Sequence, residues 1–397
     1  MAKKSTLFPG NCMTVTAGSY SKSNPFLARI KERYDLCKAG SQKSTFHVAL
    51  DLQGSGMTYE VGDSIAIQPT NDPEIVQKVL NLLKASYHTL ISDKHTQEPL
   101  PLQEYLSRKV NLAEVPKKLI GEMAKRQTNP IKKERLEHLI SEGQRELLKE
   151  YQAAHEVWDA IAENEEVVFE AEEFCHLLQP LLPRFYSISS SMHAVGEEVH
   201  LLVAEVKYVT NQHQRHGVCT HYLCHRAPLN IPIVPVYIQP SHGFTLPSSH
   251  DIPMIMVGPG TGVAPYRAFM QERQLRLANG HHWLFFGEWH RDTEFFYEEE
   301  WKELVQAGRL RLDTAFSRDQ EHKVYVQHKM LEHGKELFNL LETGAILYVC
   351  GDAHRMAKDV DAALHLIVQV HGGADEAGAK GYVKKLRADK RYLRDVY

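Results

Sequence analysis

The chain has 397 residues, enough for two or three folded domains, and its 43% hydrophobic and 24% charged residues are typical of a globular protein. With 46 basic and 50 acidic residues the formal net charge is only -4, which gives no reason to expect nucleic acid or an acidic membrane as partner. No window approaches the roughly 18 to 20 apolar residues of a membrane span. The six cysteines are scattered, so we expect a cytoplasmic protein with reduced thiols and no metal site.

Residues 1–24 carry no apolar periodicity and are predicted to form an N-terminal tail. Short alternating or apolar stretches then predict strands at 45–50, 64–68, 184–189, 198–208 and 233–239. Between these groups the pattern is helical. The sequence therefore predicts an antiparallel β-barrel made of residues 25–72 and 180–248, interrupted by a helical domain over residues 73–179.

The first helix of this insert has clear start signals. Asp72 can cap it, Pro73 fits its first turn, and one face is apolar: Ile75, Val76, Val79, Leu80 and Leu83. Residues 131–150 predict one charged amphipathic helix. The acidic stretch 163–173 is interpreted as a solvated helix face, with contact to an electron-transfer partner as the alternative.

Residues 249–397 change to apolar runs at 254–257, 283–286 and 346–349, each followed by a turn and a helical stretch. This alternation predicts a parallel, doubly wound sheet. The run at 254–257 leads into a Gly-rich turn and a helix that begins near Pro265. Such a turn presents backbone amides to a diphosphate, although a turn of this kind by itself can be merely tight.

Three further groups of residues carry cofactor chemistry. Residues 317–327 gather hydroxyls, cations and an amide suited to a 2'-phosphate, unless they are ordinary surface charges. Residues 184–187 offer a cation, an aromatic ring and a hydroxyl to a flavin, although Tyr186 alone is more often a core residue. Gly217 stands where a helix starts, a second position for phosphate. Two phosphate sites imply two nucleotides.

Seven strings together resemble the reductase half of diflavin reductases, and most closely the flavoprotein subunits of assimilatory sulfite reductases: RFYSISSS, GVCTHYL, GPGTGVAPYRAFMQER, LFFGEWHRDTEFFY, SRDQEHKVYVQ, YVCGDAHRMAKDV and RYLRDVY. The resemblance implies a ferredoxin-NADP reductase-like fold with FAD and NADPH as cofactors. It assigns residues 249–397 to NADPH and the barrel to FAD. Because only about two dozen residues precede the barrel, we expect no FMN domain in this chain.

The resemblance also implies roles for single residues. FAD would contact Arg184, Phe185, Tyr186, Ser187, Tyr208, Gly217, Val218, Cys219 and Thr220. NADPH would contact Gly260, Thr261, Ser317, Arg318, Lys323, Tyr325, Gln327 and Asp359. Ser187, Cys350 and Asp395 would surround the reacting atoms, and Tyr397 would cover the isoalloxazine. By position alone, Cys350 is a small buried side chain and Tyr397 a frayed end.

The expected function is hydride transfer from NADPH to FAD and release of electrons to a separate acceptor protein, a sulfite reductase-type hemoprotein. A ferredoxin, flavodoxin or cytochrome reductase, working as a diaphorase, is an alternative that the motifs do not separate. A non-catalytic flavin-binding module is an alternative of another class. The presence of Ser187, Asp395 and the 2'-phosphate residues argues against that module.

Overall fold

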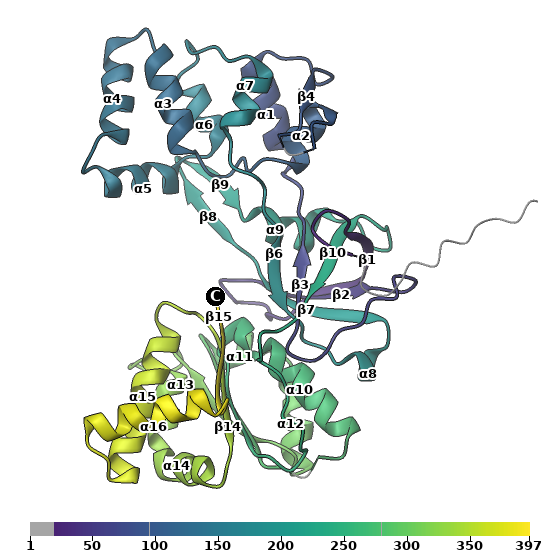
Figure 1. The fold of residues 1–397 in the computed structure, drawn as a ribbon, viewed down its shortest axis with the longest axis vertical. Helices are drawn as coiled ribbons and strands as arrows, with labels where there is room; N and C mark the ends of the chain where they lie inside the picture. The colour runs from purple at the N-terminus through teal and green to yellow at the C-terminus, as the bar shows by residue number, and fades with distance from the viewer. Residues whose placement is uncertain (1–19, 95, 279) are drawn as a thin grey trace, which may run out of the picture.

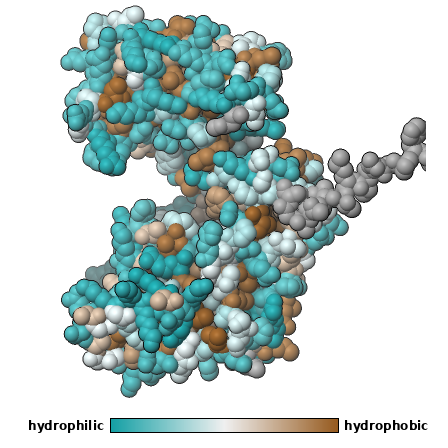
Figure 2. All heavy atoms as spheres, in the orientation of Figure 1, coloured by the Kyte–Doolittle hydropathy of each residue, from teal (hydrophilic) through white to brown (hydrophobic). Residues whose placement is uncertain are grey.

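A computed structural model describes residues 20–94, 96–278 and 280–397 and stacks three bodies along its long axis (Figure 1). An antiparallel barrel lies between a helical body and a parallel sheet covered by helices. Figure 2 shows a narrow, hollowed waist between the helical body and the other two. Most of the predicted tail, with Cys12, lies outside the described residues. Among the described helices, none is long and apolar enough to cross a membrane.

The barrel is a six-stranded antiparallel sheet that curls around an apolar core. Its strands, in the spatial order β6-β3-β10-β1-β2-β7, are β1 (Phe26–Asp35), β2 (Thr45–Asp51), β3 (Ser64–Ile67), β6 (Arg184–Ser187), β7 (Glu198–Ala204) and β10 (Val234–Gln239). The two edges meet where the amide of Ser189 donates to the carbonyl of His200 at 2.8 Å. The short helix α8 (Met192–Val195) links β6 to β7. The predicted antiparallel barrel is confirmed.

The prediction of one strand over residues 198–208 is wrong. The chain breaks after β7, and β8 (Lys207–Thr210) pairs instead with β9 (His213–His216) in a hairpin that reaches toward the helical body (Figure 1). At the break, the amide of Glu205 donates to Ser44 and that of Val206 to the hydroxyl of Thr220. The residue alternation continues through this point, so only these partners, distant in sequence, mark the end of the strand.

The helical body has its own apolar core. Its elements are α1 (Pro73–Leu83), β4 (Leu90–Ser92), β5 (Pro99–Pro101), α2 (Leu102–Arg108), α3 (Lys117–Arg126), α4 (Pro130–Ile140), α5 (Arg145–Ala154), α6 (Val157–Ala162) and α7 (Ala171–Leu177). The predicted start of α1 is confirmed, because Oδ1 of Asp72 accepts the amide of Glu74 at 2.8 Å. Val76, Val79 and Leu80 are buried on the predicted face.

Two predictions for this body are wrong in detail. The single helix over 131–150 is two helices, α4 and α5, because Gly143 adopts a left-handed φ of 84° between them. The acidic stretch 163–173 begins with a turn at residues 163–166 and continues as irregular chain, and α7 begins only at Ala171. Several of its carboxylates are paired within the body; Glu166, for example, accepts from Lys132 at 2.7 Å.

The third body is a parallel sheet with an apolar core on each face, as predicted for a doubly wound fold. Its strands, in the order β13-β12-β11-β14-β15, are β11 (Met254–Val257), β12 (His282–Glu288), β13 (Arg311–Phe316), β14 (Ile346–Gly351) and β15 (Tyr392–Val396). The helices are η2 (Gly260–Val263), α10 (Ala264–Leu275), α11 (Arg291–Glu294), α12 (Glu298–Gln306), α13 (Val326–Glu332), α14 (Gly334–Glu342), α15 (Met356–Gly372) and α16 (Glu376–Ala388).

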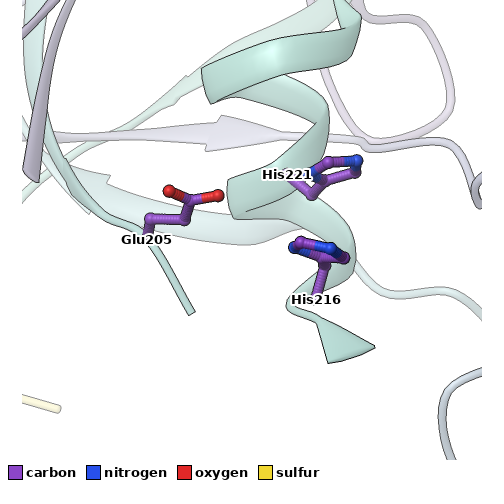
Figure 3. A group of neighbouring side chains, drawn as sticks. All are labelled: Glu205, His216 and His221. Atoms are coloured by element: carbon purple, nitrogen blue, oxygen red, sulfur yellow. The ribbon is translucent and has the colours of Figure 1, made fainter. Parts of the chain in front are cut away.

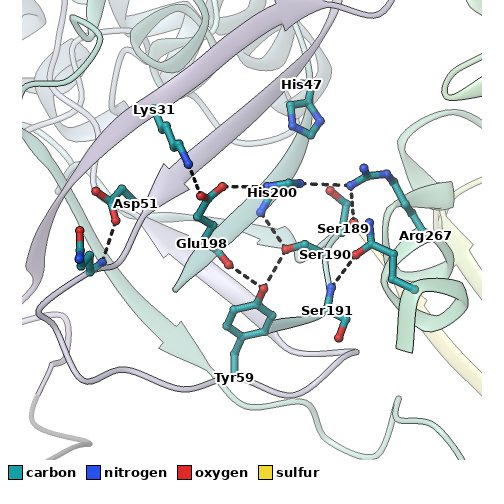
Figure 4. A network of polar contacts seen from close by, with 12 residues as sticks. Lys31, His47, Asp51, Tyr59, Ser189, Ser190, Ser191, Glu198, His200 and Arg267 are labelled. Atoms are coloured by element: carbon teal, nitrogen blue, oxygen red, sulfur yellow. Dashed lines mark hydrogen bonds and ion pairs between the residues drawn. The ribbon is translucent and has the colours of Figure 1, made fainter. Parts of the chain in front are cut away.

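A buried polar network joins the barrel to the parallel-sheet body (Figure 4). Arg267 of α10 is only 8% exposed, and its guanidinium donates to the carbonyl of Ser189 at 3.0 Å and to Glu300 at 2.8 and 2.9 Å. The same group lies 4.5 Å from the ring centre of Tyr297, whose hydroxyl is 2.7 Å from Nδ1 of His47 in β2. Because a buried guanidinium is tolerated only when its donors are paired, this network fixes how the two bodies meet.

Candidate active site

The three bodies meet at a cleft of about 850 Å³, within the size range of cofactor sites. The helical body contributes Ala113 and Glu114, and the parallel-sheet body contributes Thr261 and Ala264. The residues of the cleft that the sequence predicted as contacts are Arg184, Phe185, Tyr186, Ser187, Tyr208, Gly217, Val218, Cys219, Thr220, Thr261 and Tyr397. Folding thus brings these predicted contacts from five separate stretches of the chain to one cavity.

Strand β6 lines the cleft with four consecutive side chains, Arg184 to Ser187. Tyr186 packs against the barrel core, and burial raises the pKa of its hydroxyl well above the usual value. The phenol therefore stays neutral and is held by packing. Phe185 is 53% exposed and meets the ring of Tyr237 edge-on, with the ring centres 6.4 Å apart. The strand thus offers one rigid ring and one solvent-facing ring at the cavity.

A tight turn at Gly217 starts the short helix α9 (Val218–His221), which continues into the π-helical turn η1 (Tyr222–Arg226). A Cβ at Gly217 would lie 2.7 Å from Oγ1 of Thr220 and 2.8 Å from Cβ of Val206, so only glycine fits. The first amides of a helix have no partner within it and favour an anion. Burial raises the pKa of Cys219 to about 12, so its thiol adds no negative charge at this position.

Tyr208 reaches the cleft from the β8–β9 hairpin and is 39% exposed. Its cross-strand neighbour Arg215 is 2% exposed and ties the hairpin to α6 of the helical body. The guanidinium of Arg215 donates to Glu156 at 2.9 Å and to Asp159 at 2.7 Å. This buried ion pair, which sequence reasoning did not identify, holds Tyr208 at the junction of the two bodies.

Ser187, Cys350 and Asp395 lie together where the barrel faces the parallel sheet. The hydroxyl of Ser187 donates to Oδ2 of Asp395 at 2.7 Å, and Sγ of Cys350 lies 3.8 Å from the same oxygen. Cys350 and Asp395 are register neighbours in β14 and β15. Burial, together with the Asp395 carboxylate, raises the pKa of Cys350 well above its usual value. The thiol is therefore protonated at neutral pH.

The C-terminal residue is fixed by hydrogen bonds. The amide of Tyr397 donates to Gly351 at 3.1 Å, and its carbonyl accepts from Ala353 at 3.1 Å. Its hydroxyl lies 3.0 Å from Oγ1 of Thr261. The residue is nevertheless 60% exposed and lines the cleft, so the backbone contacts hold an aromatic side chain at the mouth of the cavity.

The Gly-rich turn follows β11 at the carboxyl edge of the parallel sheet, where ligands of such sheets bind. A Cβ at Gly258 would lie 2.4 Å from the carbonyl of Gly262, and one at Gly262 would lie 2.2 Å from the carbonyl of Cys350. Gly260 has a left-handed φ of 59°. Close contacts therefore require glycine at positions 258 and 262, and the left-handed backbone favours it at position 260. The turn packs directly against the backbone of Cys350.

The predicted 2'-phosphate residues follow β13 at the same edge of the sheet. Ser317 and Arg318 extend the parallel pairing, since their amides donate to the carbonyls of Glu288 and Trp289 at 2.8 and 2.9 Å. Ser317 is 7% exposed, while Lys323 is exposed and Tyr325 is 41% exposed. Farther along, the amide of Gln327 donates to Asp359 at 3.3 Å. These residues form an open strip rather than an enclosed cavity.

Trp289 is a member of this strip that sequence reasoning missed. The guanidinium of Arg318 lies 3.4 Å from its ring centre, and Nζ of Lys43 lies 4.7 Å away. Arg318 also donates to Oε1 of Gln42 at 3.4 Å. The position of Trp289 directly after an apolar strand could have indicated it, because neighbouring parallel strands end at the same edge.

Comparison with known proteins identifies the class of this fold and site. Residues 18–222 match the family described as FAD binding domain, and residues 256–362 match the oxidoreductase NAD-binding domain. The first match covers more than half of the chain, and the chain belongs to the FAD binding domain family.

Among individual proteins, the chain is 40% identical over 380 residues to the sulfite reductase [NADPH] flavoprotein alpha-component of Bacillus subtilis strain 168. This alignment covers 96% of the chain and 62% of the relative. The protein of the same name from Vibrio cholerae serotype O1 is 40% identical over 379 residues, which are 95% of the chain and 60% of that relative. The chain thus spans about three fifths of the length of these relatives.

Proposed function

We propose that this chain takes a hydride from NADPH onto FAD bound in the cleft and delivers electrons to a separate acceptor protein. The observation that carries the proposal is the Ser187, Cys350 and Asp395 group, which lies between the predicted FAD residues of β6 and the Gly-rich turn. FAD in the cleft and NADPH on the Gly-rich turn could therefore both reach this group of three residues. We further propose residues 25–72 with 180–248 as the FAD unit, 73–179 as the connecting unit and 249–397 as the NADPH unit.

The cleft fits FAD in size and in chemistry. Gly217 leaves a space that a Cβ would fill, and the amides that follow can receive the pyrophosphate, with Arg184 as the neighbouring cation. Tyr186 and Tyr397 supply flat apolar surfaces, and Tyr208 lines the nucleotide half of the cavity. FAD, when bound, supplies a ring system that accepts a hydride and releases electrons singly.

Ser187, Cys350 and Asp395 would have different roles in this reaction. The Asp395 carboxylate stabilises positive charge that develops on a nicotinamide as hydride leaves, which is electrostatic stabilisation by a fixed group. The Ser187 hydroxyl holds that carboxylate in place at 2.7 Å. Because burial keeps the Cys350 thiol neutral, it shapes the site without acting as a nucleophile.

NADPH would bind along the carboxyl edge of the parallel sheet. Gly260 and Thr261 approach its diphosphate, as the turn geometry favours. Ser317, Arg318, Lys323 and Tyr325 receive the 2'-phosphate, while Gln327 and Asp359 contact the nucleotide. The stacking of Arg318 on Trp289 supports this role, because it holds the cation near the place where the phosphate must be recognised.

For the acceptor we propose a sulfite reductase-type hemoprotein, on the support of the names of the relatives. A flavodoxin, ferredoxin or cytochrome acceptor is the alternative that the experiment must exclude. We propose a cytoplasmic location, where NADPH and reduced thiols are found.

Anaerobic titration of the FAD-loaded chain with NADPH tests the proposal. NADPH should bleach the flavin absorbance at one equivalent per chain, and addition of a sulfite reductase hemoprotein should restore it faster than a flavodoxin or ferredoxin does. An FAD-loaded chain that NADPH leaves oxidised would contradict the enzymatic assignment and favour the non-catalytic module. If only a flavodoxin or ferredoxin restored the flavin absorbance, the proposed acceptor would be wrong but the reduction of FAD by NADPH would stand.

A further inference from the structure

A cluster of potential metal ligands lies beside the cleft and has no role in the proposed reaction (Figure 3). Glu205 lies in the link between β7 and β8, His216 ends β9, and His221 ends α9. One ligand atom from each residue lies within 4.8 Å of the other two. Figure 3 shows the carboxylate of Glu205 reaching toward the two imidazole rings. We propose that these three residues bind a divalent transition-metal ion, with zinc as the preferred ion.

The cluster is largely shielded from solvent, and each histidine turns one ring nitrogen away from water. The side chain of Glu205 is 1% exposed. In the part of the chain that the structure describes, Nδ1 of His216 and Nδ1 of His221 are shielded from solvent without a hydrogen-bond partner. A buried polar atom without a partner has lost its hydrogen bond to water and gained none in return, which is unfavourable. A bound metal ion would satisfy both nitrogens at once.

Neighbouring side chains supply the outer contacts that metal sites require. Oδ2 of Asp72 lies 3.5 Å from Nε2 of His221, which favours a proton on Nε2 and leaves the lone pair on Nδ1. Nε2 of His225 lies 2.7 Å from Oε1 of Glu205 and orients the carboxylate. Both contacts hold the ligands without occupying the unpartnered nitrogens.

Lys207 is the competing cation at this position. Its Nζ lies 2.6 Å from Oε2 of Glu205, while its side chain is 46% exposed. Because nearly half of the Lys207 side chain is exposed, its ammonium can return to water when an ion takes its place beside Glu205. The ammonium of Lys207 does not donate to the Nδ1 atoms of the two imidazoles, which have no hydrogen-bond partner among the described residues. A metal ion can therefore displace it into solvent.

Two imidazoles and one carboxylate are a ligand set that zinc uses, with water in the fourth position. Ligand atoms around a tetrahedral zinc ion are about 3.3 Å apart, as follows from bond lengths near 2.0 to 2.1 Å. The rings of His216 and His221 are stacked with their centres 4.2 Å apart, so at least one imidazole must rotate before both lone pairs point at a shared ion. The ion would connect the link between β7 and β8 to the end of α9, the helix that Gly217 precedes.

The test is zinc affinity of the tag-free, FAD-loaded chain, measured by competition with a chromophoric chelator. We expect one zinc ion per chain, with affinity reduced about ten- to a hundredfold or more by His216→Gln and by His221→Gln. His213→Gln is the matched control, because His213 is an exposed histidine of the same hairpin. Lys207→Met should tighten binding, since it removes the competing cation and keeps all three ligands.

Two results would overturn the site. Equal zinc affinity in the wild type, His216→Gln and His221→Gln would place the ion elsewhere among the 23 histidines. Absence of stoichiometric zinc in both the wild type and Lys207→Met would exclude it altogether. The Lys207→Met comparison remains decisive if a histidine variant fails to fold, and neither measurement depends on NADPH oxidation.

Discussion

The two nucleotide sites of this protein are built in different ways. The proposed FAD cleft is a deep, partly open cavity that collects residues from the barrel, the helical body and the Gly-rich turn. The predicted 2'-phosphate strip is more open, and its main members lie within residues 317–327 of one loop and helix start. Substitutions at the junction of the bodies should therefore weaken FAD binding and leave the 2'-phosphate strip intact. Loss of a single charge in the strip should weaken NADPH binding and leave FAD binding intact.

The largest effect is expected from Arg267→Ala at the junction. Removal of a buried, paired guanidinium should lower the free energy of unfolding by about 3 kcal/mol and weaken FAD retention. Affinity for 2',5'-ADP should change little in the folded protein. Urea denaturation, FAD release and calorimetry measure the three quantities, with the exposed Arg291→Ala as control. A parallel loss of both ligands would show that the two sites are not separable.

Asp395→Ala should slow flavin reduction about a hundredfold by removing the carboxylate that stabilises developing charge. Ser187→Ala should have a smaller effect, and the double variant should be less than additive because the two side chains share a 2.7 Å hydrogen bond. Stopped-flow absorbance measures the rate. Asp389→Asn, at the end of α16, serves as the control. Additive losses would mean that Ser187 acts independently of Asp395.

Arg318→Ala should weaken NADPH binding about ten- to a hundredfold and leave NADH use nearly unchanged, because a single charge-assisted contact is lost. FAD content should stay at one per chain. Steady-state kinetics with both coenzymes provide the measurement. If the two coenzymes lose equally, Arg318 does not recognise the 2'-phosphate.

The junction should also respond to pH. Burial, with His200 and Arg267 nearby, lowers the pKa of His47 to about 3 from an unfolded value near 6.5. The unfolded state thus binds the proton more readily, so stability is complete above about pH 6.5 and falls as pH drops toward 3. The protonation of His47 should lower the free energy of unfolding by about 1 kcal/mol between pH 8 and pH 5.5. His47→Gln should remove that part of the slope, whereas His88→Gln, at an exposed site, should not.

The smallest effect concerns Tyr397. If its ring covers the isoalloxazine, Tyr397→Ala removes a stacking contact worth about 1 kcal/mol and should raise the NADH to NADPH rate ratio about fivefold. FAD should be retained, because Tyr397 is 60% exposed and most of the cleft is lined by other residues. Flavin spectra and stopped-flow reduction provide the test. An unchanged spectrum and an unchanged ratio would leave Tyr397 as an ordinary chain terminus.

Sequence patterns predicted elements well wherever neighbouring residues set the structure. The start of α1 is one such case, since Asp72, Pro73 and the apolar face act within a few residues. The strands β11, β12 and β14 are another, because runs buried on both faces are apolar throughout. Boundaries were missed at Gly143, between α4 and α5, and at Glu205, after β7, where the surrounding residues keep the same periodicity.

What the sequence alone determined is therefore local: the alternating strands, the glycines of the turn after β11, and the chemical types of residues that suit two nucleotides. Tertiary structure decided the rest. It added the 2.7 Å hydrogen bond between Ser187 and Asp395, which the family resemblance had only grouped at the site. It also put Arg267 between two bodies and gathered Glu205, His216 and His221. These contacts join residues that no short-range pattern relates, because their separation is set by sheet order and domain packing and not by distance along the chain.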